Sequence, residues 1–196
     1  MESIETAQYA TICNKYNMPL RFDKNSKCYT LKFNCKNSHF NFDELISFNI
    51  YNLIEKLNPD LIHKIEILKE YSKDEIDVLF IFKRVGAELG LAQKYMALHV
   101  EKKQIENNIY INSSHINYSK DNFEKRLEPL ICEFSEMILY NTHLSMLDLY
   151  YKFNINTNED LPIYMENYIG LMIKKIFFNL KVFIDNFDNN NRIDDT

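Results

Sequence analysis

The clearest hydrophobic pattern in the chain lies near its C-terminal end. Apolar residues recur there at steps of three and four from residue 161 to residue 187, the spacing that puts side chains on one face of an α-helix. Asn158, Glu159, Asp160 and Pro162 supply the cap, acids and early proline typical of a helix start. The pattern predicts an amphipathic helix of about seven turns at ~3.6 residues each.

A second helical pattern occupies residues 43–57. Its apolar positions are also three and four residues apart, and Asn41 precedes it as a possible N-cap. Pro59 disfavours a helical conformation in Asn58, so the helix is expected to end there. Short strands are predicted before this helix and between the two helices. Apolar residues recur at alternate positions in residues 29–33, 61–71, 76–82, 98–101, 109–112, 130–140 and 147–155.

Some of these strands carry further expectations. Residues 76–82 are apolar on both faces, which is typical of a strand inside a sheet. Asn107 and Asn108 favour a hairpin turn, and residues 141–143 are predicted to form another. In residues 130–140, Leu130, Cys132, Phe134, Ile138 and Tyr140 share one side. The segments that join consecutive strands are too short for the crossover that parallel strands need, so these strands are expected to pair antiparallel.

Together these elements predict a single α+β domain over residues 1–196. Its antiparallel sheet has about six to seven strands, with one helix in the N-terminal half and the long C-terminal helix packed on the sheet. Residues 1–25, which contain Pro19, are expected to be an irregular lead-in, and residues 188–196 a flexible tail. From Cys28 to Phe187 the order of elements resembles the helix-grip architecture of Bet v 1-like and START-like domains, in which a curved sheet wraps a C-terminal helix. An order of elements implies no function.

Composition excludes several classes of protein. The chain is 46% hydrophobic with 14 Phe and 13 Tyr, enough for a folded core, and it has only 3 Gly and 4 Pro. A formal charge of -5 has the wrong sign to attract phosphate, so no nucleic acid partner is expected. Heavy use of Asn, Ile, Lys and Tyr without Trp indicates an A+T-rich genome, as in some protozoa, low-GC bacteria and large DNA viruses.

The cysteines and the N-terminus suggest a soluble, intracellular protein, in the cytoplasm or in a particle assembled there. Cys13, Cys28, Cys35 and Cys132 form no C-x-x-C pair, so free thiols in a reducing compartment are expected. The first ten residues lack the apolar stretch of a secretory signal. Residues 168–187 are largely apolar but are interrupted by three lysines, two asparagines and one aspartate, so no membrane span is predicted.

No motif predicts catalysis, a cofactor or a metal site. No two of the five histidines have helical ligand spacing, and Gly86 with Gly90 lacks the other residues of a phosphate-binding loop. A non-enzymatic protein is therefore favoured. An enzyme remains an alternative, because residues such as His99, Cys132 and Glu133 could converge in the fold without a linear motif.

Two functional hypotheses follow. The first is a protein-interaction or assembly module, acting through a protein partner or self-association, because Phe177 and Phe178 cannot both face one core stripe of the last helix. Its interaction residues would be Tyr164, Tyr168, Phe177 and Phe178. The alternative is a binding module for a small apolar ligand, held between the sheet and the C-terminal helix in a cavity lined by Met165, Ile169, Met172 and Ile176.

Overall fold

The computed structural model describes residues 9–40, 42, 47–84, 92–119, 127–143, 145–156 and 163–188, without the side chains of residues 141–143 and 163–166. In chain order its elements are β1 (Tyr9–Cys13), β2 (Leu20–Asp23), β3 (Cys28–Lys36), α2 (Ile50–Leu57), β4 (Ile62–Ser72), β5 (Glu75–Phe82), β6 (Gln93–Ile105), β7 (Asn108–His115), β8 (Leu127–Pro129), β9 (Phe134–His143), β10 (Met146–Asn154) and α3 (Ile163–Asp185).

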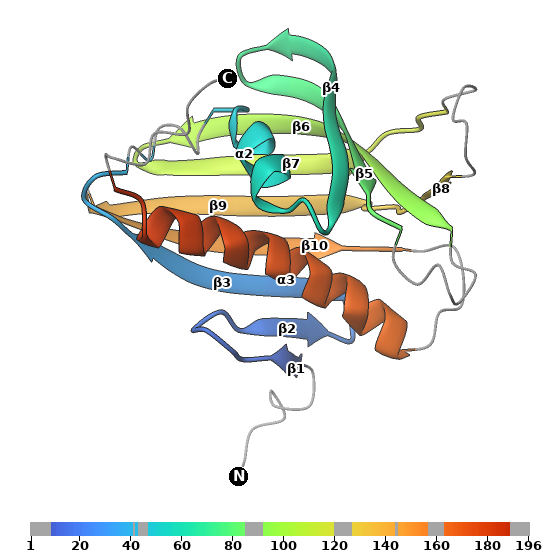
Figure 1. Ribbon diagram of the computed structural model, residues 1–196, viewed down its shortest axis with the longest axis horizontal. Helices are drawn as coiled ribbons and strands as arrows, with labels where there is room; N and C mark the ends of the chain where they lie inside the picture. Colours follow the sequence, from blue (N-terminus) through green and yellow to red (C-terminus); the bar gives the residue numbers. More distant parts are fainter. Residues whose placement is uncertain are drawn as a thin grey trace.

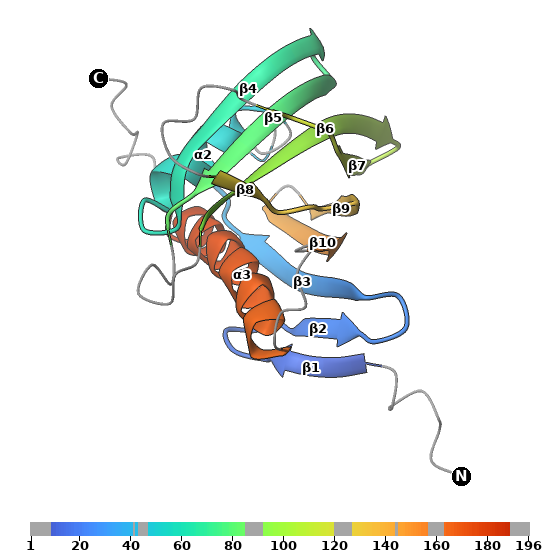
Figure 2. The same cartoon turned by 90° about the vertical axis from the view of Figure 1, so that its right-hand side faces the viewer.

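All described strands belong to one ten-stranded sheet. Its order is β1-β2-β3-β10-β9-β7-β6-β5-β4, and β8 adds to β6. Figure 1 shows α3 crossing one face of this sheet, and Figure 2 shows the strands curving around the side that carries both helices. The predicted α+β fold, an antiparallel sheet closed by a long C-terminal helix, is confirmed.

The hydrophobic pattern explains where the core lies. Ile76 and Val78 of β5 face the helices and are fully buried, and on α3 Leu180 and Ile184 are buried against the same core. The other face of β5 is also covered, because Leu79 and its neighbours form a second, smaller buried cluster. The strand with two apolar faces is therefore inside the sheet, between β4 and β6.

The expectation of an irregular lead-in is wrong for residues 9–13 and 20–23, which form β1 and β2. Tyr16 and Asn17 have positive φ angles and lie in the turn that brings β2 back along β1. Leu20 pairs with Leu31 of β3 and both are fully buried. β2 pairs with the edge of β3 and β1 pairs with β2, so both strands are stabilised by sheet pairing although their own sequence carries little alternation.

Several element boundaries also differ from the predictions. The helix expected at 43–57 begins at Ile50 among the described residues, after a turn at residues 47–49, while Asn41 and residues 43–46 lie outside the description. β9 continues through His143, so residues 141–143 are strand and not a turn. At the β6–β7 hairpin the positive φ angle belongs to Glu106. β8 pairs with β6 in parallel.

Two further results concern the described residues alone. None of the helices in these ranges, α3 included, combines the length and apolar character that crossing a membrane requires. No group of three or more His, Cys, Asp or Glu side chains in the same ranges is arranged to hold a metal ion. Gly86 and Gly90, considered above as a phosphate loop, lie outside the description, as does the tail from residue 189.

Candidate ligand-binding site on the inner face of the sheet

The inner side of α3 meets the sheet through the residues predicted to line a cavity. Met172 and Ile176 are buried, and Ile169 is partly buried against the same core. The side chain of Met165, the fourth predicted residue, lies outside the description. These residues are three and four apart, so one face of the helix carries them all.

Aromatic rings cover the sheet beneath this helix face. The ring of Tyr151 on β10 lies 4.8 Å from that of Phe153 and 5.0 Å from that of Phe177 on α3, between centroids. Tyr29 on β3 stacks on Phe153 at 5.3 Å. The rings thus form one connected layer between α3 and the strands β3 and β10.

The residues predicted for a protein interface are distributed differently. Phe177 is only 5% exposed, because it points into the core. Phe178 is partly buried and stacks on Tyr16 at a centroid distance of 4.4 Å. Tyr168 is 45% exposed, and the side chain of Tyr164 lies outside the description. Phe177 and Phe178 do face different sides of the helix, but the second side packs on the N-terminal segment.

The two helices are not equally close to all strands. The backbone of α3 approaches β3 most closely among the strands, that of α2 approaches β4, and neither comes comparably near to β7 or β9. Figure 2 shows the same arrangement, with β7 and β9 in the middle of the curve. Side chains alone must therefore fill the space between the middle strands and the helices.

Several side chains on this inner side are only partly buried. Register puts Met137 of β9 directly opposite Tyr151, and Ser113 and His115 follow on the inner side of β7. All four side chains keep accessible surface, whereas the neighbouring Ile111 is buried. Tyr51 of α2, which packs edge-on against Phe80 of β5 at 5.6 Å between centroids, is also only partly buried.

The phenol groups of Tyr51 and Tyr151 are strongly desolvated. Burial raises the pKa of the Tyr51 phenol well above its usual value. Burial also raises the pKa of Tyr151, with smaller contributions from Cys132 and Tyr51, while a hydrogen bond with Ser135 opposes the shift. Phenols so strongly desolvated do not face bulk water. Tyr51 and Tyr151 therefore combine partial accessibility of the side chain with strong desolvation of the phenol.

A few polar groups project toward this space from the sheet. Ser135 is 4% exposed and lies directly opposite Ser113 in the β7–β9 pair. Nδ1 of His115 is buried and has no hydrogen-bond partner in the described part of the chain. We call Tyr51, Ser113, His115, Ser135, Met137 and Tyr151 the inner-face site.

Sequence reasoning missed this site. The spacing grouped Phe134, Ile138 and Tyr140 on one side of β9, but Phe134 is 39% and Tyr140 is 36% exposed, and the opposite set, Ser135, Met137 and Leu139, faces the helices. The sequence did contain a signal for the orientation of β9. On β10, Leu147, Leu149, Tyr151 and Phe153 form an uninterrupted apolar side, and the β9 residues paired with them must face the same way.

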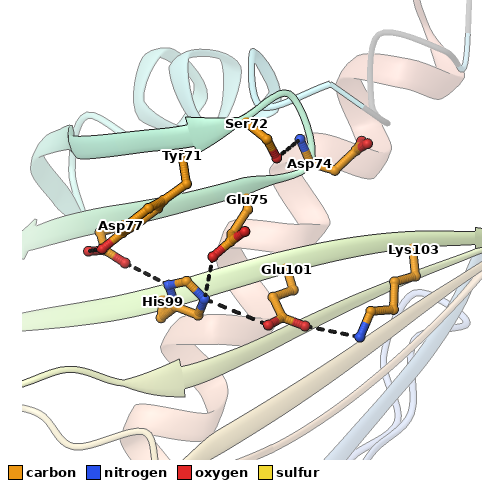
Figure 3. Close-up of polar contacts among 8 residues, drawn as sticks. All are labelled: Tyr71, Ser72, Asp74, Glu75, Asp77, His99, Glu101 and Lys103. Atoms are coloured by element: carbon orange, nitrogen blue, oxygen red, sulfur yellow. Dashed lines mark hydrogen bonds and ion pairs between the residues drawn. The ribbon is translucent and has the colours of Figure 1, made fainter.

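The residues considered for an enzymatic site are not brought together. Figure 3 shows His99 among acids on the outer face of β5 and β6, with Nδ1 2.7 Å from Asp77 Oδ1 and Nε2 3.4 Å from Glu75 Oε1. Cys132 donates a hydrogen bond to the carbonyl of Phe134, and Glu133 accepts one from Asn154. The three predicted residues therefore have separate partners.

One open groove lies on the outward side of α3. It has a volume of about 490 Å³ and is lined by Leu57, Phe178, Asn179, Val182, Phe183, Asn186 and Phe187. Phe178, predicted as an interaction residue, thus borders this outer groove and not the inner-face site.

Comparison with known proteins identifies the fold. No protein-family model matches the chain, and no curated protein matches its sequence. Among solved structures, the lipid transfer and protein localization domain of human StarD13 has a TM-score of 0.72 at 8% identity, covering 93% of this chain and 94% of that domain. Human StAR-related lipid transfer protein 5 gives 0.70 at 11% identity, covering 91% and 87%. A StAR-related lipid transfer protein from Xanthomonas axonopodis gives 0.68 at 10%, covering 90% and 98%.

At these identities the likeness establishes the fold alone. It agrees with the resemblance inferred from the order of elements, since these are START-like domains. It contradicts the assembly-module hypothesis: three structures that share the fold are described as lipid transfer domains or proteins, and the alternative of a small apolar ligand fits them better. The aromatic residue Phe177, taken as a sign of an exposed interface, belongs instead to the core.

Proposed function

We propose that this protein binds a small apolar ligand between the middle strands of the sheet and helices α2 and α3. The observation that carries the proposal is the state of Tyr51 and Tyr151, which keep accessible surface although burial strongly desolvates their phenols. Solved structures with the same fold, described as lipid transfer domains or proteins, support an apolar ligand.

The surroundings favour an apolar ligand. Ile111, Leu139 and Phe153 adjoin the inner-face site on the sheet, and Met172 and Ile176 of α3 are buried in the same hydrophobic core. Transfer of apolar surface from water into such a space is favourable by roughly 25 cal/mol per Å². Phe177, which packs on Tyr151, limits the room on the side of β3, so the ligand is expected to be small.

Two neighbouring residues of β7 provide a matched test. Ser113 points toward the inner-face site, and Ser114 points to the outer face and is exposed. Ser113→Phe should fill the space and weaken binding of an uncharged, environment-sensitive apolar dye such as a solvatochromic fatty ketone. Ser114→Phe places the same ring on solvent-facing strand surface and should leave dye binding unchanged.

Native mass spectrometry of the purified protein should in addition detect a bound apolar molecule in the wild type and less of it in Ser113→Phe. Circular dichroism of both variants shows that they are folded. Absence of any dye or ligand binding by the folded wild type, or equal binding by the two folded variants, contradicts the proposal.

A further inference from the structure

We infer, on the basis of the proposed function, that the ligand carries an uncharged hydrogen-bonding group, a hydroxyl or a carbonyl, held by Ser113, His115 and Ser135. The ligand class is thus an apolar alcohol or ketone. Fatty acid anions and phosphate-bearing lipids are not expected to bind at this site.

The first argument is the placement of the polar groups. Ser113 and Ser135 oppose each other across the β7–β9 pair, where side chains lie about 5 Å apart. His115 is the next inner-face residue along β7, and Tyr151 on β10 hydrogen-bonds with Ser135. A largely apolar layer thus contains one compact polar patch, the arrangement that orients a ligand by a single polar end.

The second argument is the Nδ1 atom of His115. This atom is buried and has no hydrogen-bond partner among the described residues. Burying a polar atom without a hydrogen-bond partner is unfavourable, so the folded protein is stabilised if a ligand supplies that partner. A hydroxyl can donate to or accept from an imidazole nitrogen, and a carbonyl can accept when that nitrogen is protonated.

The third argument is charge. Among the described residues, Lys94 and Lys102 of β6 take inner-face positions, but each forms an ion pair at 2.8 Å, Lys94 with Glu128 and Lys102 with Asp74. The buried Lys174 of α3 donates to Cys13 and to the carbonyl of Lys15, near β1. None of these three lysines is directed to Ser113 or Ser135 by these contacts. An ionised head group would therefore be buried beside neutral hydroxyls, which is strongly unfavourable.

The test compares ligands with the same ten-carbon chain: 1-decanol, 2-decanone, decanoate, decyl phosphate and decane. Each is titrated as a competitor of the apolar dye near pH 8, where decanoate and decyl phosphate are ionised. Decanol and decanone are expected to compete roughly tenfold more strongly than decanoate or decyl phosphate, the ratio that 1.4 kcal/mol produces. Ser135→Ala and His115→Phe should each reduce the preference for decanol over decane several-fold, with Ser114→Ala as the unchanged control.

The outcomes separate this inference from the proposed function. Decanoate or decyl phosphate competing as strongly as decanol overturns the inference and leaves apolar binding intact. An unchanged preference for decanol in folded Ser135→Ala and His115→Phe also overturns it. If neither the dye nor any of the five compounds binds the folded wild type, the proposed function itself fails.

Discussion

Gly170 of α3 lies directly against the ring of Tyr29 on β3. A Cβ atom at position 170 would come within 2.7 Å of Tyr29 Cε1 and 2.9 Å of Cδ1. Tyr29 is 3% exposed and is held between Phe22 and Phe153, so its ring has little freedom to move. The missing side chain of Gly170 is what allows α3 to approach this side of the sheet.

Gly170→Ala should therefore destabilise the protein, although alanine is the better helix former by about 1 kcal/mol. Overpacking against a fixed ring costs about 1–3 kcal/mol, which outweighs that gain. Urea unfolding followed by circular dichroism measures the difference. In a Tyr29→Ala background the clash is absent, and Gly170→Ala should stabilise. A higher midpoint for Gly170→Ala in the wild-type background would refute the close approach.

Asn37 caps the C-terminal end of α3 from a distant part of the chain. Its Nδ2 donates to the carbonyls of Ile184 and Phe187, both at 2.7 Å. Asn37→Ala leaves these acceptors without this donor and should lower the free energy of unfolding by about 1–3 kcal/mol.

The exposed Asn186, which bonds the carbonyl of Val182 within the same helix turn, is the control, and Asn186→Ala should cost less than about 0.5 kcal/mol. Chemical denaturation of both variants gives the comparison. Similar losses for the two would show that the distant cap contributes no more than a local surface bond.

Asn58 links α2 to α3. It is fully buried, its Nδ2 donates to the carbonyl of Ile54, and its Oδ1 accepts from Asn179 at 2.9 Å. Asn58→Ala should cost about 1–3 kcal/mol and more than Asn179→Ala, because Asn179 is only partly buried. A double-mutant cycle should give a coupling of about 0.5–1 kcal/mol between the two residues. Strict additivity would mean that the bond between them does not stabilise the helix pair.

Cys13 should be the most reactive thiol of the described structure. Burial raises its pKa, but hydrogen bonds from the Lys15 backbone and the Lys174 ammonium, 3.1 Å away, more than offset this and leave the pKa below the usual value. Burial raises the pKa of Cys35 and of Cys132 to about 12. Since the thiolate is the nucleophile, iodoacetamide near pH 7 should label Cys13 well before Cys35 or Cys132 in the native protein, as read by peptide mass spectrometry.

Lys174→Met removes the ammonium and should slow labelling of Cys13 near pH 7. Near about pH 10 the thiol ionises without that help, so the difference between variant and wild type should narrow. A constant ratio of labelling rates across this range would mean that Lys174 affects access to Cys13 and not its ionisation.

The hydrophobic periodicity of the sequence was enough to identify some of the helices and strands. The spacing that ends at Phe187 predicted α3, which runs to Asp185, and the two apolar faces of residues 76–82 predicted β5 inside the sheet. Hydrophobic periodicity decides these cases because each element buries a face that its own sequence provides. β1 and β2 depend instead on sheet pairing, because β2 adds to the edge of β3 and β1 adds to β2.

The orientation of β9 and the inner-face site depend on pairing between strands. Ser113 and Ser135 are far apart in sequence and lie opposite each other only because β7 pairs with β9 in this register. A shift of one residue would turn Ser135 and Met137 outward, and no feature of either strand alone excludes that register.

The sequence by itself determined that this protein is an α+β domain with an antiparallel sheet and a long amphipathic C-terminal helix, because periodicity records which face of each element must leave water. Only the tertiary structure decided which side of β9 faces inward, how the sheet curves around α2 and α3, and which polar groups meet on its inner face. These depend on strand register and on close contacts such as that of Gly170 with Tyr29, which join residues distant in the chain.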